Sequence, residues 1–221
     1  MKRRVLETLV RNSSRAWVRA LDIASGEERL IDPSKDDSPL GQAAKKAASA
    51  DISAEIELDG HTWFLEVHNP PLELMLVGAV HIAQPLAAMA RLAGYHVRVV
   101  DPRTAFATPE RFPGVTLHPD WPDDFFAATP PSVRTALVVL AHDPKIDDPA
   151  LEAGLRSPAF YIGALGSKKT HAARLERLGG RGFPPEALAR IRGPVGLAIG
   201  ARSPAEIALS ILAQITETLR A

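Results

Sequence analysis

The sequence predicts an α/β protein in which a smaller α+β domain precedes a doubly wound parallel sheet. Three observations predict this class. From Leu72 onward, short apolar segments alternate with amphipathic ones, which is the order of strand–helix–strand units. The apolar segment Ala136–Leu140 contains no polar residue, as is typical of strands covered on both faces of a parallel sheet. Before Asn69, several short segments instead alternate apolar and polar residues singly, which predicts antiparallel hairpins.

Residues 1–70 are expected to form the smaller domain. Its predicted strands and helix lie at residues 17–23, 29–32, 52–58 and 62–67, and at 38–50. The helix is predicted to begin at Ser38 and Pro39, because serine caps helices and proline suits the first helical position. Asp59-Gly60 is expected to be a two-residue hairpin turn. The rigid segment Asn69-Pro70-Pro71 is predicted to link this domain to the second one, residues 71–221.

The second domain is expected to alternate strands and helices. Predicted strands lie at residues 74–77, 96–100, 115–118, 136–140 and 160–162. Predicted helices lie at residues 81–93, 149–156, 168–178, 185–190 and 204–219. The last helix is expected to begin with a capping box made by Ser203 and Glu206. In such a sheet, ligands bind at the carboxyl ends of the strands.

Composition excludes several classes of function. Lysine plus arginine equals aspartate plus glutamate, at 26 each, so net charge gives no case for nucleic acid or an anionic membrane. Apolar segments reach only strand length, well short of the roughly 20 residues that span a bilayer. The basic N-terminus has no apolar core behind it, so a cytoplasmic protein is expected. There is no cysteine, which excludes disulfides, thiolate metal sites and cysteine nucleophiles.

The turn after the first strand of the second domain predicts a Rossmann-like unit. Gly78 follows the apolar strand, His81 begins the helical pattern, and Asp101 ends the next strand, where a ribose-binding carboxylate is expected. Arg103 could accept a phosphate instead. Val80 replaces the glycine that normally admits a pyrophosphate. The alternative interpretation is a plain tight turn at Gly78 and an Asp-Pro turn at Asp101.

A polar segment follows the predicted strand 136–140. The segment 141–145 comes directly after this strand and contains His142, an acid and a lysine, a combination that suits acid–base work or binding of a polar ligand. The alternative is that the acids, Asp147 and Asp148, only cap a helix starting at Pro149. Pairs of histidines or carboxylates at helical spacing are missing, so no metal site is predicted.

A glycine-rich segment with two lysines opens the helix after the strand 160–162. Gly163, Gly166, Ser167, Lys168 and Lys169 combine flexible backbone, a capping hydroxyl and positive charge. These are the components of an anion site at a helix N-terminus. The spacing of the glycines is not that of a P-loop. A plain N-cap with a solvated basic turn remains the alternative interpretation.

Several segments together resemble the XdhC/CoxF family of accessory factors for molybdenum hydroxylases. They are VGAVHIA at 77–83, VDPR at 100–103 with FATPERFP at 106–113, HDPKIDDPAL at 142–151, YIGALGSKKTH at 161–171 and IGARSPAEIA at 199–208. The family usually has glycine in place of Val80 and aspartate in place of Ala198. Its N-terminal domain usually carries a glycine-rich segment and cysteine, which residues 1–70 lack.

The resemblance implies a Rossmann-like domain that binds molybdenum cofactor (molybdopterin), supports its sulfuration and delivers it to a xanthine dehydrogenase- or CO dehydrogenase-type apoenzyme. A cysteine desulfurase is the second partner that it implies. Such a carrier needs no catalytic residue. Residues expected to contact the cofactor are Gly78, His81, Asp101, Arg103, His142, Gly163, Gly166, Ser167, Lys168 and Lys169, with the phosphate at the start of the helix 168–178.

Two alternatives remain open from the residues. One is an NAD(P)-dependent oxidoreductase, which Asp101 favours and Val80 opposes. The other is a ligand-free docking scaffold for the hydroxylase or the desulfurase. A homodimer is expected on general grounds, because symmetric dimers are the commonest soluble oligomers.

Overall fold

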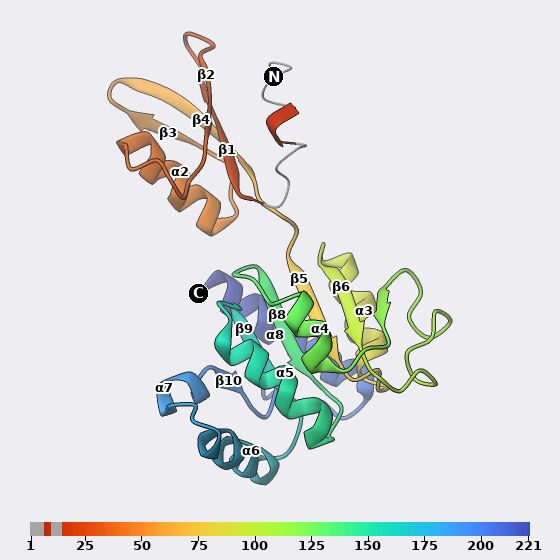
Figure 1. Ribbon diagram of the computed structural model, residues 1–221. Helices are drawn as coiled ribbons and strands as arrows, with labels where there is room; N and C mark the ends of the chain where they lie inside the picture. Colours follow the sequence, from red (N-terminus) through yellow and green to blue (C-terminus); the bar gives the residue numbers. More distant parts are fainter. Residues whose placement is uncertain (1–6, 10–14) are drawn as a thin grey trace. The chain divides into compact units, whose positions relative to one another are not determined.

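The computed structural model describes residues 7–9 and 15–221. The chain divides into two compact units, Met1–Pro70 and Pro71–Ala221. Each unit has its own sheet (Figure 1). Within the described residues, no helix has the length and hydropathy needed to cross a bilayer.

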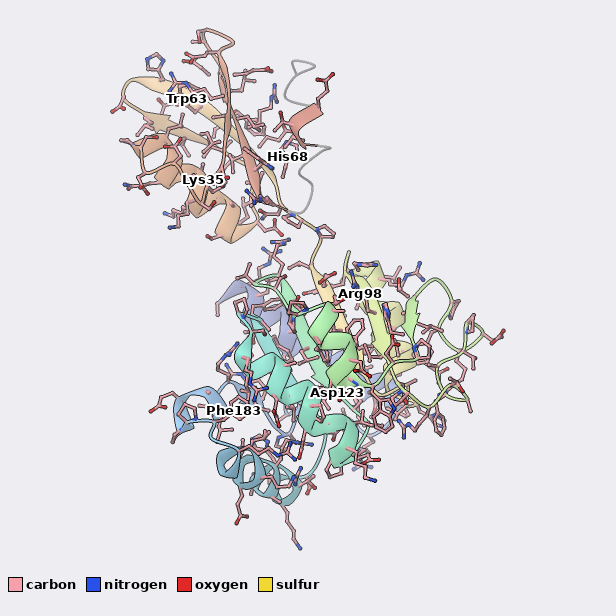
Figure 2. The ribbon with its side chains drawn as sticks, viewed as in Figure 1. Lys35, Trp63, His68, Arg98, Asp123 and Phe183 are labelled. Carbon is pink, nitrogen blue, oxygen red and sulfur yellow. The ribbon has the colours of Figure 1, made fainter. Side chains whose placement is uncertain are left out.

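The first unit is a four-stranded antiparallel sheet covered by one helix on one face. Its elements are β1 (Trp17–Asp22), β2 (Glu28–Ile31), α2 (Pro39–Ala50), β3 (Ala54–Leu58) and β4 (His61–His68), and the strand order is β2-β1-β4-β3. Trp63 on β4 (Figure 2) belongs to a small core that includes Leu65 and, from α2, Leu40 and Ala44. Both predicted hairpins and the predicted helix are therefore present, with Ser38 capping α2.

The second unit is a six-stranded parallel sheet between two layers of helices. Its elements are β5 (Glu73–Val77), α3 (Ala83–Leu92), β6 (His96–Val100), β7 (Thr116–His118), α4 (Pro122–Ala128), β8 (Thr135–Val139), α5 (Pro144–Arg156), β9 (Tyr161–Ala164), α6 (Lys168–Gly180), α7 (Pro185–Leu188), β10 (Ile191–Arg192) and α8 (Pro204–Arg220). Helices α3 and α8 bury one face of the sheet, and α4, α5 and α6 bury the other. The predicted doubly wound, Rossmann-like architecture is confirmed.

The strand order β10-β9-β8-β5-β6-β7 defines where a ligand site is expected. From β5 the chain adds β6 and then β7 on one side of the sheet. It then crosses back and adds β8 on the other side of β5. The loops after β5 and β8 therefore leave the sheet in opposite directions. A crevice opens between such loops at the carboxyl edge of the sheet.

Helix α5 starts earlier than the sequence predicts. It begins at Pro144, and the carboxylate of Asp143 caps it by accepting a hydrogen bond from the Lys145 N–H. Pro149 was expected to open this helix, but it lies inside it. The expectation that Asp147 and Asp148 cap the helix is therefore wrong, and both are buried within its first turns. The short elements α4 and β10 were not predicted.

Candidate functional site

A pocket of about 400 Å³ lies at the carboxyl edge of the parallel sheet. The residues that line this carboxyl-edge pocket are Val80, His81, Ile82, Arg103, Phe106, Arg111, His142, Leu165 and Pro204. They come from the loops after β5, β6, β8 and β9 and from the first residue of α8. The structure therefore brings together three predicted site residues from distant parts of the chain: His81, Arg103 and His142.

Asp101 lies behind the carboxyl-edge pocket and holds Arg103 in place. Its carboxylate is fully buried and accepts hydrogen bonds from Nε and Nη2 of Arg103, each at 2.8 Å. It also accepts the Ala79 N–H at 2.7 Å. Burial alone would raise the pKa of Asp101, but these hydrogen bonds outweigh it and hold the pKa below its usual value. Asp101 thus joins the β5–α3 turn to the arginine that lines the pocket.

Gly78 makes the turn after β5 possible. Its φ is +105°, and an added Cβ would lie 2.7 Å from the backbone nitrogen of Ala141. Both facts require glycine. The turn is followed by Val80 and His81 in the pocket wall, and α3 begins at Ala83 rather than at His81. Ile82, the residue before α3, makes no capping hydrogen bond through its side chain.

Two residues that sequence reasoning missed, Phe106 and Arg111, complete the pocket wall next to Arg103. The guanidinium of Arg103 lies 4.9 Å from the centroid of the Phe106 ring, and that of Arg111 lies 5.9 Å from it. Arg111 also donates a 2.6 Å hydrogen bond to the Phe106 carbonyl. Two cations therefore flank one aromatic ring at the pocket. The sequence feature that points to them is an aromatic residue and an arginine shortly after the end of a strand, because ligands bind at strand ends in such sheets.

His142 lines the pocket in an unusual backbone conformation. Its φ is +63°, which is uncommon for any residue but glycine and occurs at functional sites. Burial lowers the pKa of His142, and the nearby guanidinium of Arg174 lowers it further. The imidazole is therefore mainly neutral near pH 7 and can accept a hydrogen bond.

The predicted anion site at the start of α6 lies beside the pocket rather than in its wall. Gly166 has φ +144°, and the hydroxyl of Ser167 caps α6 by accepting the Thr170 N–H. The side chains of Lys168 and Lys169 are exposed, and of this segment only Leu165 lines the pocket. Gly163 is buried in β9, where an added Cβ would clash with Val195.

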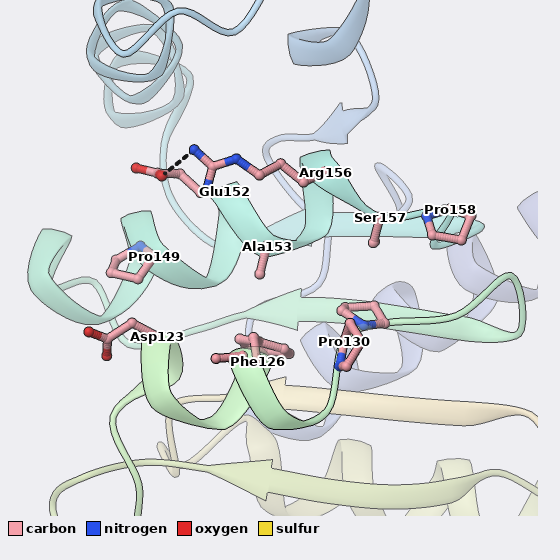
Figure 3. A pocket seen from close by; sticks show the side chains of 11 residues that line it. Asp123, Phe126, Pro130, Pro149, Glu152, Ala153, Arg156, Ser157 and Pro158 are labelled. Carbon is pink, nitrogen blue, oxygen red and sulfur yellow. Dashed lines mark ion pairs between the residues drawn. The ribbon is translucent and has the colours of Figure 1, made fainter.

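A second cavity, of about 530 Å³, lies between α4 and α5 (Figure 3). Phe126, Ala153 and four prolines form much of its wall, and an ion pair between Glu152 and Arg156 lies at its side. None of the predicted site residues lines it. Helices bound it on the flank of the sheet, away from the loops that follow the strands, so the carboxyl-edge pocket is the better candidate site.

A parallel sheet of this order, with a ligand-sized pocket at the point where the order reverses, defines a Rossmann-like α/β domain with a candidate ligand site. Residues 74–215 match the family model described as the XdhC Rossmann domain. The chain belongs to this family.

The sequence is similar to proteins from Escherichia coli and Bacillus subtilis. It is 34% identical over 157 residues to the uncharacterized protein YqeB of Escherichia coli, covering 70% of this chain and 28% of YqeB. It is 33% identical over 147 residues to the molybdenum cofactor insertion chaperone PaoD of E. coli, covering 66% of this chain and 40% of PaoD. It is 35% identical over 159 residues to a probable xanthine dehydrogenase subunit of Bacillus subtilis, covering 70% of this chain and 45% of that protein.

The matched segment spans less than half the length of each of these relatives. A crystal structure described as a xanthine dehydrogenase from Bacillus halodurans has a TM-score of 0.74 to this chain at 23% identity. The match covers 98% of this chain and 65% of that one. At this identity, the likeness bears on the fold alone.

Proposed function

We propose that this protein binds molybdenum cofactor in the carboxyl-edge pocket and assists its insertion into a molybdenum hydroxylase of the xanthine dehydrogenase type. One observation carries the proposal. The pocket wall places two arginines against one aromatic ring, which suits a flat heterocycle that carries a phosphate. The name of the relative PaoD, a molybdenum cofactor insertion chaperone, supports the same cargo.

The residues of the carboxyl-edge pocket fit this cargo chemically. Its volume of about 400 Å³ lies within the ~300–1,000 Å³ typical of small-molecule sites. Val80, Ile82 and Leu165 provide apolar wall, and Phe106 adds an aromatic ring that both arginines contact. Hydrogen bonds from a guanidinium to a phosphate oxygen contribute roughly 1.5–3 kcal/mol each. His81 and His142 also line the pocket and would contact polar atoms of the cargo.

The start of α6 offers a second position for the phosphate. The N–H groups at a helix N-terminus favour an anion, and Lys168 and Lys169 add positive charge. Gly166 and Ser167 shape this turn beside Leu165. Gly78, Asp101 and Gly163 support the site from behind, through the turn, the ion pair and the packing described above. Variants of Arg111 and of the two lysines distinguish the two positions.

The proposal includes the partners that delivery requires. A cytoplasmic accessory protein of this kind would receive sulfur for the cofactor from a cysteine desulfurase and would dock on the apo-hydroxylase. Because the described residues offer no cysteine, the sulfur would pass to the cofactor without a thiol of this chain. A homodimer is the oligomer that we expect in solution.

The geometry does not favour the NAD(P)-dependent alternative. In a dinucleotide site, the carboxylate after the second strand accepts hydrogen bonds from ribose hydroxyls. Here both oxygens of Asp101 already accept hydrogen bonds from Arg103, and the carboxylate is fully buried. Val80 also lies in the pocket wall, where a pyrophosphate would need glycine.

Retention of the cofactor tests the proposal. The chain is purified from cells that make the cofactor, and its bound pterin is oxidised and measured by fluorescence. We expect the wild type to retain pterin and the Phe106→Ala/Arg111→Met variant to retain about tenfold less. The matched control is Trp121→Ala/Arg156→Met, which removes an exposed aromatic residue and an exposed arginine elsewhere.

Transfer of the cargo is measured next. Cofactor bound to the chain should activate an apo-hydroxylase faster than the same amount of free cofactor. If the wild type retains no more pterin than the pocket variant, and gives no gain in activation, the function is not that of a carrier. The remaining alternative would then be the docking scaffold.

A further inference from the structure

A buried ion pair that is poorly satisfied lies directly behind the carboxyl-edge pocket. Asp147 on α5 and Arg174 on α6 are 4% and 1% exposed. The nearest approach is 3.7 Å, between Nη2 of Arg174 and Oδ2 of Asp147, which is too long for a good hydrogen bond. Oδ1 of Asp147 and Nε and Nη1 of Arg174 are buried without a hydrogen-bond partner. Unpaired atoms of this kind are costly and call for an explanation.

The neighbouring carboxylate, Asp148, shows what a satisfied pair looks like in the same helix. It is fully buried, and Arg177 donates to both of its oxygens at 3.0 and 3.2 Å. Arg181 adds an ion pair at 3.1 Å. Asp148 therefore joins α5 to α6 without help from Asp147. The strained pair, as we call the poorly satisfied ion pair of Asp147 and Arg174, is therefore not needed to bring these two helices together.

Each member of the strained pair instead contacts a loop that lines the pocket. Arg174 donates a 2.8 Å hydrogen bond from Nη2 to the carbonyl of Leu165, a pocket residue. The backbone N–H of Ala141, next to the pocket residue His142, acts on the Asp147 carboxylate and lowers its pKa. Through these contacts the pair connects the loop after β9 to the loop after β8.

We propose that Asp147 and Arg174 are positioning residues that hold the Leu165 and His142 walls of the carboxyl-edge pocket together, so that retention of the cargo depends on their ion pair. This inference rests on the proposed function. The pair touches the two loops rather than the cargo. A carrier must both retain its cargo and release it, and an ion pair with unpaired atoms can rearrange at less cost than a satisfied one.

Protonation of Asp147 is expected to loosen this connection. Burial raises the pKa of Asp147 to about 6, although the charge of Arg174 opposes the shift. Asp148 and Asp143 on α5 also raise this pKa. Arg177 on α6 and Arg103 after β6 carry opposite charges nearby. Between pH 7 and pH 5 the carboxylate therefore becomes neutral, and Arg174 loses its ion-pair partner, while the charge of Asp148 remains nearby.

Loss of retention in this range would not reflect unfolding caused by Asp147. A carboxyl group whose pKa is raised on folding stabilises the folded state below its unfolded pKa of ~3.9 and loses that contribution as the pH rises through ~6. Acidification from pH 7 to pH 5 thus favours folding through this group. His142 and His171 also titrate in the acid range, because burial lowers the pKa of both, so the test must isolate the carboxyl group.

The experiment measures cofactor retention of the full chain between pH 5 and pH 7.5, with molybdopterin taken from a molybdenum enzyme as the probe. For the wild type we expect a loss of about tenfold in affinity on acidification, with a midpoint near 6. Asp147→Asn, which imitates the protonated acid, should bind at pH 7 as the wild type does at pH 5 and should show no midpoint near 6. Asp147→Asn with the wild-type pH profile would overturn the inference.

Arg174→Met should weaken retention at pH 7 by about tenfold, and Arg174→Lys should restore only part of it, because lysine lacks the planar fork. The matched control is Arg181→Met, which removes the arginine directly after α6; this arginine pairs with Asp148 and does not line the pocket. If Arg174→Met does not fold, the double variant Asp147→Asn/Arg174→Met removes both buried charges and avoids an unpaired one. Wild-type affinity in either variant would also overturn the inference.

A second measurement, without cofactor, separates this inference from the proposed function. At pH 7, amide hydrogen exchange in residues 140–146 and 163–170 should be faster in Asp147→Asn than in the wild type, and unchanged in Arg181→Met. If the wild type binds no molybdopterin at any pH, the proposed function fails. Unchanged exchange in Asp147→Asn would show that the pair does not hold the loops.

Discussion

Asp101 and Arg103, two residues apart at the end of β6, form a two-point ion pair in which both carboxylate oxygens face the guanidinium at 2.8 Å. The carboxylate is buried and the guanidinium reaches the carboxyl-edge pocket. The same carboxylate accepts the Ala79 N–H from the turn after β5. One acid thereby orients a pocket cation and secures the turn after the neighbouring strand, β5.

Asp101→Asn should therefore lower the free energy of unfolding by about 2 kcal/mol, because a charge-assisted hydrogen bond is lost while the amide oxygen still accepts the Ala79 N–H. The pKa of Asp101 is lowered on folding, so its contribution is present above ~3.9 and is lost as the pH falls further. Urea unfolding at pH 7 and pH 3 measures both effects. The difference between the two proteins should be larger at pH 7 than at pH 3, and equal stability at pH 7 would contradict this role.

Gly78→Ala should prevent close approach of the turn after β5 to the loop after β8. The added Cβ would lie 2.7 Å from the backbone nitrogen of Ala141, at a positive φ. We expect a loss of about 3 kcal/mol in unfolding free energy from strain and displaced backbone together. Gly94→Ala is the matched control, since Gly94 also has a positive φ but nothing within 4 Å of an added Cβ. It should lose about 1 kcal/mol, and equal losses would contradict the close approach.

Arg111→Met should weaken binding of molybdopterin by about tenfold, because one charged contact with the cargo is removed. The thermal midpoint should fall only slightly, because Arg111 is partly exposed and its internal contact is one hydrogen bond to the Phe106 carbonyl. Lys168→Ala/Lys169→Ala should have a smaller effect, because these side chains do not line the pocket. Titration of the fluorescent pterin measures both. A larger loss in the lysine variant would place the phosphate at the start of α6 instead.

Residues 71–221 should fold as an independent domain. Each unit has its own hydrophobic core, and no core cluster of the described residues contains members from both. A chain that begins at Pro71 should show a single cooperative unfolding transition, observed by circular dichroism. It should also match residues 71–221 of the full chain in the hydrogen exchange of β5 and β8. Fast amide hydrogen exchange in β5 of the shorter chain would contradict this division into two domains.

Most of the fold follows from local patterns in the sequence, and the exceptions have physical causes. β10 has two residues and α4 has seven, which is too short for a periodic pattern to stand out. The start of α5 was misplaced because two prolines, Pro144 and Pro149, each follow an acid that can cap a helix. Asp147 and Asp148 are buried by arginines of α6, and sequence spacing does not reveal such partners.

The site was predicted only in part for a similar reason. His81, Arg103 and His142 follow strand ends, and the parallel sheet brings all strand ends to one edge. Arg111 and Phe106 lie in a loop without regular structure, so no periodic rule places them. Lys168 and Lys169 follow a strand end too, but a helix directs successive side chains in different directions. Exposure of these lysines is therefore decided by the orientation of α6, not by their position in the sequence.

The carboxyl-edge pocket draws its wall from residues as far apart as Val80 and Pro204, and α8, which carries Pro204, packs against α3. On the ribosome, β5 and α3 emerge long before α8 does. A partly synthesised chain thus lacks the side of the cavity that Pro204 provides, so on the proposed function cargo would be loaded only after α8 has been made.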